Sequence, residues 1–277
     1  MISLILSLIT SVAFAYIPEY SLLANHASDQ HGKGGYYIEQ EVSYKKDGET
    51  YTVKEMWTVT GEHALRVTLE GRGPLRGLVQ GTLVYDGTSK YFFENGSPNI
   101  HSTRLGEDWL EPLFHFRNPK WFRNRLVSLK VTPAESLRDR PALPSEGDVK
   151  YEAPSYLRLS RSGGTTAWAI GVPPTVGVSP TLWMEQDQFV VRKFRGADQG
   201  VMRADDYAHF EDGLWYPRLR SYSFNGQTIT IQTLRVKSLG KLKSDDKMFK
   251  TASLTAAKDS VKLPDVEALR EFYSRYR

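Results

Sequence analysis

Alternation of apolar and polar residues between tight-turn signals is the feature that most constrains this chain. The stretches 38–44, 51–59 and 65–69 all follow this period-2 pattern. Asp47-Gly48 separates the first two stretches, and Asp-Gly pairs favour two-residue hairpin turns because both positions tolerate positive φ. A period of two sends alternate side chains to opposite faces of a strand. The pattern predicts an antiparallel meander with one apolar face.

The same pattern continues through most of the remaining sequence. Strands are predicted at 77–85, 90–94, 156–161, 165–172, 181–185, 189–195, 201–210, 214–224 and 227–239. Turn signals such as Asn225-Gly226 lie between them. Short strands spaced by eight to twelve residues, with turn signals between, are typical of all-β folds. We therefore expect a mainly β protein with a few helices.

Three segments depart from the strand pattern. A short helix is expected after Pro18, because Tyr20, Leu23, Ala24 and Ala27 follow helical spacing. Segment 98–154 is rich in aromatic residues, and its prolines predict several short helices and a Pro-rich loop inserted into the sheet. Pro264 is expected to begin a last helix, at about 264–276.

The N-terminus resembles an export signal. Residues 2–15 carry no charge, and Ala13-Phe14-Ala15 has the small-x-small pattern that signal peptidase cleaves. No basic residue follows Met1, and a buried N-terminal strand or helix is the alternative interpretation. We predict a cleaved signal at 1–15, a single domain at 16–277 and a soluble periplasmic protein.

Composition and motifs exclude several classes of function. The chain has no cysteine, which rules out disulfide scaffolds, thiol nucleophiles and Cys-type zinc sites. Its six histidines lack metal-ligand spacing, and no nucleophile elbow or phosphate-binding loop is present. A formal net charge of +4 over 277 residues is too small to indicate nucleic acid. We expect no cofactor, no metal, no nucleic-acid partner and no enzymatic activity.

Aromatic residues make up 12% of the chain and lie on the predicted strands and in the central segment. For any one of them, packing in a core is an equally good interpretation. Taken together, they predict a half-open barrel whose apolar interior is closed by an aromatic lid, a common place for ligands. The expected cavity lining is Ile38, Val42, Val53, Trp57, Val59, Leu65, Val67, Leu69, Trp183, Phe189, Tyr216, Ile229 and Ile231. The expected lid is Trp109, Leu110, Leu113, Phe114, Trp121 and Phe122.

Several short motifs resemble one protein family. They are Gly35-Tyr36-Tyr37-Ile38-Glu39-Gln40-Glu41-Val42, Glu55-Met56-Trp57, Leu182-Trp183-Met184-Glu185-Gln186-Asp187 and Asp212-Gly213-Leu214-Trp215-Tyr216-Pro217. The sequence is similar to the outer-membrane lipoprotein-sorting carriers of the bacterial periplasm, the LolA/LolB-like proteins, over about half the chain. The resemblance implies an incomplete antiparallel β-barrel wrapped over short helices that act as a lid.

The resemblance also implies a function and partners. A LolA-like protein would bind lipid or the acyl chains of lipoproteins in its apolar cavity and shuttle them toward the outer membrane. Its partners would be membrane-associated release and acceptor proteins. Without cysteine the chain cannot be the acceptor type, which is itself a lipoprotein. Arg66 is a candidate for the polar contact that closes the lid in these carriers.

Two other hypotheses stay open at this point. The first is a periplasmic sensor or scaffold of the same fold, in which the Arg-rich C-terminal helix docks on an envelope protein. The second is a hydrolase of envelope lipids or glycans, for which the sequence singles out no catalytic pair.

Overall fold

The computed structural model describes residues 17–106, 108–138, 154–175 and 177–277. The predicted export signal, and part of the predicted loop within 98–154, lie outside these ranges. None of the helices in these ranges is long and apolar enough to cross a membrane.

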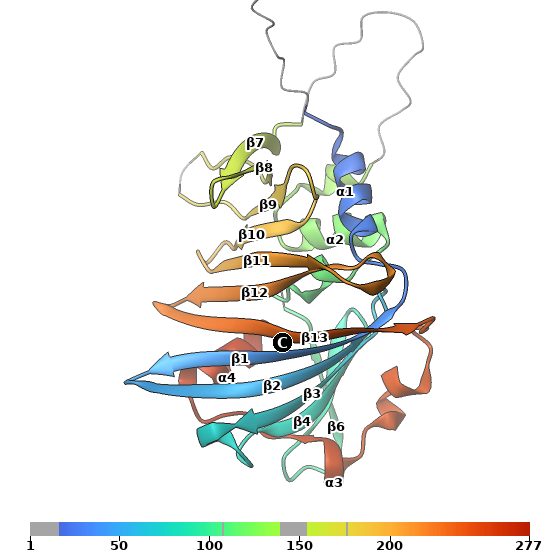
Figure 1. Cartoon of the computed structure of the whole chain (residues 1–277), viewed down its shortest axis with the longest axis vertical. Coiled ribbons are helices and arrows are strands. Elements are labelled where there is room, and N and C mark those ends of the chain that lie inside the picture. The colour runs from blue at the N-terminus through green and yellow to red at the C-terminus, as the bar shows by residue number, and fades with distance from the viewer. Residues whose placement is uncertain (1–16, 107, 139–153, 176) are drawn as a thin grey trace, which may run out of the picture.

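Strands dominate the described chain, as the alternation predicted (Figure 1). The strands of the first half are β1 (Gly35–Lys46), β2 (Glu49–Val59), β3 (Leu65–Arg72), β4 (Gln80–Tyr85), β5 (Ser89–Glu94) and β6 (Ile100–Arg104). Those of the second half are β7 (Leu157–Ser162), β8 (Thr165–Ile170), β9 (Thr181–Glu185), β10 (Val191–Arg195), β11 (Val201–His209), β12 (Trp215–Phe224), β13 (Gln227–Gly240) and β14 (Ser260–Val261).

The helical elements are few and short. The α-helices are α1 (Tyr20–Asp29), α2 (Pro119–Ser128), α3 (Ala256–Asp259) and α4 (Glu267–Arg275). Single 3-10 turns are η1 (Gly73–Leu75), η2 (Glu111–Phe114), η3 (Ala134–Leu137), η4 (Glu211–Gly213), η5 (Lys247–Phe249) and η6 (Thr251–Ser253). Helix α1 buries the four residues of its predicted stripe.

All described strands join one sheet, in the order β14-β5-β4-β3-β2-β1-β13-β12-β11-β10-β9-β8-β7, with β6 on β5. Neighbours are antiparallel except for β14, which is parallel to β5. The sheet does not close on itself, so the architecture is an open half-barrel, which confirms the predicted fold class. The two halves of the chain meet where β1 pairs with β13, for example at Val42 and Ile231.

Two of the predicted tight turns have the expected backbone. Asp47 and Gly48 have φ of 51° and 81°, and Asn225 and Gly226 have φ of 48° and 72°. Positive φ at both central residues matches the twist of the flanking strands. These turns fix the register of the β1–β2 and β12–β13 hairpins.

Two expectations about the helical segments need correction. Segment 98–154 begins with a strand, β6, which pairs with β5, whereas only helices and a loop were expected there. The side chains of β6 are nearly all exposed, so its sequence has no alternation of apolar and polar residues. The last helix begins at Glu267 rather than at Pro264.

Helices cover the inner face of the half-barrel. Figure 1 shows α1 and α2 beside the strands of the second half, with α4 behind β1 and β2. The apolar positions of the sheet and these helices form one continuous core cluster, from Tyr20 to Tyr276. Part of the outer face is covered as well, because Val84, Phe93 and Leu254 form a separate small cluster there.

Candidate functional site

The inner face of the half-barrel gathers most of the predicted cavity-lining residues. The predicted lining residues that belong to the main core cluster are Ile38, Val42, Val53, Trp57, Val59, Leu65, Val67, Leu69, Tyr216, Ile229 and Ile231, each 2% exposed or less. Phe189 is half-buried and packs against the same cluster. The alternation therefore brought residues from five strands, β1, β2, β3, β12 and β13, onto one apolar surface.

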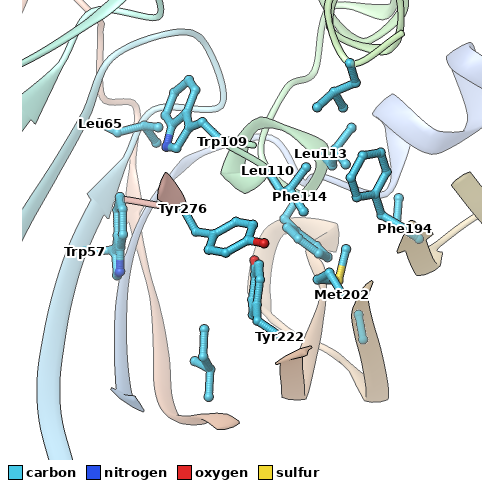
Figure 2. Packing of buried hydrophobic residues seen from close by; sticks show 14 of the residues in the cluster. Trp57, Leu65, Trp109, Leu110, Leu113, Phe114, Phe194, Met202, Tyr222 and Tyr276 are labelled. Carbon is cyan, nitrogen blue, oxygen red and sulfur yellow. The ribbon is translucent and has the colours of Figure 1, made fainter. Parts of the chain in front are cut away.

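The predicted lid packs directly on this surface (Figure 2). Trp109, Leu110, Leu113, Phe114 and Phe122 all belong to the main core cluster. The Trp109 ring stacks on Tyr85 of β4, with 5.4 Å between ring centroids and 6° between planes. The Phe114 ring meets Tyr216 of β12 edge to face at 6.2 Å. Segment 109–122 thus contacts strands from both halves of the sheet, β4 and β12.

Trp121, the remaining lid residue, is half-buried and does not belong to this cluster. Its ring packs against His63 and Phe116.

Two predicted site residues lie on the outer face instead. Trp183 packs with Ala167 and Ala169 in a cluster separate from the main core. Arg66 lies on the face of β3 opposite Leu65 and Val67, where its Nη1 donates to the carbonyl of Met248 at 3.0 Å. The structure therefore does not bring Arg66 to the lid.

A network of buried charges that was not predicted from the sequence lies between the sheet and the lid. Arg277 donates from Nε to Glu55 Oε1 of β2 at 3.0 Å and from Nη1 to Glu111 Oε1 of η2 at 2.7 Å. Arg220 of β12 donates to the same Glu111 oxygen at 2.6 Å and to Gln40 Oε1 of β1 at 2.7 Å. The side chains of both arginines and both glutamates are 0% exposed.

An indole, an amide and an imidazole provide further hydrogen-bond partners for the two carboxylates. The Trp57 Nε1 and the Gln40 Nε2 donate to Glu55 Oε2 at 2.8 and 2.5 Å. His115 Nε2 lies 3.3 Å from Glu111 Oε2. A buried carboxylate is tolerated only when it is paired and hydrogen-bonded in this way.

The electrostatics favour the charged forms of Glu111 and Arg220. Burial acts to raise the pKa of Glu111, but the adjacent Arg220 and Arg277 outweigh it and hold that pKa well below its usual range. Burial acts to lower the pKa of Arg220, and Glu111 outweighs it in the opposite direction. The network therefore ties η2 in the lid, and Arg277 beyond α4, to strands β1, β2 and β12 through buried ion pairs and hydrogen bonds.

Part of this network carried a sequence signal. Gln40 lies between Ile38 and Val42, and Glu55 lies two residues from Trp57, so both occupy inward positions of an alternating strand. A polar residue at an inward position must find a buried partner. Glu111 and Arg277 lie outside any alternating stretch, and nothing local indicates their partners.

The lid is also held at its far end. His31 Nδ1 donates to the carbonyl of Phe116 at 2.6 Å. The backbone N–H of Arg117 donates to the carbonyl of Gly61 at 3.0 Å, just after β2. These contacts join the lid to the end of α1 and to the β2–β3 loop.

Arg275 of α4 adds contacts on the surface. It donates from Nη2 to Asp108, at the start of the lid, at 2.7 Å, and it also pairs with Asp198 between β10 and β11. Helix α4 itself buries Ala268, Leu269, Phe272 and Tyr273. Its apolar side is therefore packed inside the half-barrel.

No protein-family model matches the sequence, and no curated protein sequence matches it.

Solved structures do share its architecture. A LolA superfamily protein from Nitrosomonas europaea has a TM-score of 0.51 at 13% identity, over 84% of this chain and 99% of the other. An outer membrane lipoprotein-sorting protein domain, described as putative, from Vibrio parahaemolyticus has a TM-score of 0.50 at 10% identity, over 84% and 97%. A DUF1329 family protein from Desulfovibrio piger has a TM-score of 0.51 at 8% identity, over 85% and 97%. The chain therefore has the fold of the LolA superfamily structures, as the sequence resemblance implied.

Proposed function

We propose that this protein is a carrier of the bacterial envelope that binds lipid, or the acyl chains of lipoproteins, between its half-barrel and its lid. The observation that carries the proposal is the continuous apolar layer formed by the inner face of the sheet and segment 109–122. An acyl chain in this layer would gain about 0.8 kcal/mol for each CH₂ removed from water. Such a site requires no catalytic residue.

The described conformation is the closed one. The predicted lining residues of the main cluster are nearly inaccessible, and the lid rings rest against Tyr85 and Tyr216. Cargo can enter only if the lid separates from the sheet, so binding affinity reflects chain burial minus the cost of separating these contacts.

Weakening the lid contact should therefore increase cargo affinity. Replacing Trp109 by alanine removes its stacking on Tyr85, and we expect the affinity for a fluorescent fatty acid to rise at least about tenfold, which corresponds to about 1.4 kcal/mol. Fluorescence titration measures this change. Trp121→Ala is the matched control, because Trp121 is half-buried and packs against His63 and Phe116 rather than the main cluster; it should change the affinity less than twofold.

The decisive measurement is the mass of the native protein. Protein purified from a bacterial envelope extract should carry lipid that organic solvent removes. Native mass spectra that show only ligand-free protein, even after incubation with fatty acid and with diacyl phospholipid, would reject the carrier proposal.

Export is part of the same proposal. We expect the mature protein to begin at Tyr16, after the Ala13-Phe14-Ala15 site. N-terminal sequencing of protein from a periplasmic fraction tests this, and an intact Met1 would contradict it.

A further inference from the structure

A row of basic side chains crosses the outer face of the sheet, on the side away from the lid. Cross-strand pairing aligns Arg158 of β7, Ala169 of β8, Trp183 of β9, Lys193 of β10 and Arg203 of β11. Adjacent strands are about 4.8 Å apart, so Lys193 and Arg203 are neighbours. Like charges placed directly opposite each other in a ladder destabilise the sheet.

Packing holds these cations close together. Lys193 Nζ lies 4.6 Å from the centroid of the Trp183 ring, and Arg195 Cζ lies 5.5 Å from it. Burial, together with the nearby Arg203 and Arg195, lowers the pKa of Lys193. Within the part of the chain that the structure describes, none of Arg158, Lys193, Arg195 and Arg203 forms an ion pair with an acidic side chain.

An uncharged loop borders this row. Residues 171–180, between β8 and β9, contain no charged side chain. Arg158 Nη1 donates to the carbonyl of Gly171 at 2.6 Å, and Arg195 Nη2 donates to that of Ser179 at 3.4 Å. The basic side chains therefore hold both ends of the loop. Between these ends Val172 is 44% exposed and Val178 is 37% exposed.

We propose that this outer surface, comprising Arg158, Lys193, Arg195, Arg203, Val172 and Val178, docks on an anionic phospholipid bilayer. Clustered cations attract an anionic membrane surface, and exposed apolar side chains beside them enter its interfacial region. An acidic protein partner would account for the basic side chains but not for the exposed Val172 and Val178. The four cations are on the opposite face of the sheet from the cargo layer, so docking and cargo binding are separate properties.

Vesicle sedimentation of the purified full-length protein tests this proposal. We expect binding to phosphatidylcholine vesicles containing 30 mol% phosphatidylglycerol and little binding to phosphatidylcholine alone. Raising NaCl from 0.1 to 0.5 M should release the protein, because salt screens surface charges. The double variant Lys193→Gln/Arg203→Gln should bind about thirtyfold more weakly, at about fivefold per charge. Val172→Ser/Val178→Ser should bind about tenfold more weakly.

Matched controls lie elsewhere on the surface. Lys45→Gln/Lys46→Gln removes the same charge from exposed positions at the end of β1. Leu78→Ser removes an apolar side chain that is 51% exposed. Both controls should keep full vesicle binding.

Several outcomes would overturn the proposal. These are equal binding to both kinds of vesicle, equal losses in the controls, or no binding at all. Binding to soluble poly-glutamate but not to vesicles would indicate an acidic protein partner instead. Fatty-acid titration of the same variants separates this result from the carrier proposal, because the Lys193→Gln/Arg203→Gln protein should retain cargo affinity whatever happens to docking.

Discussion

Replacing Arg277 by alanine should lower the free energy of unfolding by about 3–5 kcal/mol, because the substitution leaves the buried Glu55 carboxylate without its cation. Glu111 would keep Arg220, so the loss falls mainly on the β2 side of the network. Urea unfolding followed by tryptophan fluorescence measures the change.

Arg270 provides a control on helix α4. Its side chain is 57% exposed and pairs with Asp265, which is 99% exposed. Exposed pairs contribute about 0–1 kcal/mol, so Arg270→Ala should have little effect. Adding Glu55→Gln to Arg277→Ala should recover part of the loss, because the unpaired buried charge is then gone. If Arg277→Ala were as stable as Arg270→Ala, the buried network would not contribute to the stability of the fold.

Acidification from pH 7.5 to 5.0 should lower the free energy of unfolding by about 2 kcal/mol through His31 alone. Burial, opposed by the hydrogen bond to Phe116, lowers the pKa of His31 to about 4 from 6.5. Between these values the unfolded chain binds a proton that the folded chain does not, so stability falls as the pH falls through this window. His115, whose pKa burial also lowers, acts in the same direction.

Urea unfolding at several pH values checks this expectation. His31→Gln should flatten the dependence between pH 7.5 and 5.0, and His209→Gln, at an exposed strand end, should not. The low pKa of Glu111 has a separate effect, because its stabilisation is present above the ordinary carboxyl range and is lost only as the pH falls below it. An unchanged slope in His31→Gln would contradict the assignment to His31.

The alternation was enough to predict most of the sheet, because apolar side chains recur at every second residue in a strand that has one buried face. Strand β6 could not be found in this way, since it lies at an edge with almost no buried side chain. The two-residue β14 is defined only by its pairing with β5, more than 160 residues earlier. The local sequence therefore does not indicate the pairing of β14 with β5.

The candidate site was predictable to a similar extent. The two-residue alternation predicts which apolar residues, such as Val42 and Ile231, point inward. It also places the polar residues Gln40 and Glu55 at inward positions. Arg66 had the opposite phase to Leu65 and Val67, so the same rule places it on the outer face. The partners of Glu111 lie 109 and 166 residues away, and only the assembled sheet brings them together.

The seam between β1 and β13 has a consequence for how the chain is made. β1 is synthesised long before β13, its hydrogen-bonded neighbour some 190 residues later. Until β13 arrives, β1 is an unpaired edge, and such edges promote association between chains. Pairing over this separation also closes a long loop, which makes folding slow. The completed half-barrel is therefore expected to form only after nearly the whole chain has been synthesised, with the first meander exposed in the meantime.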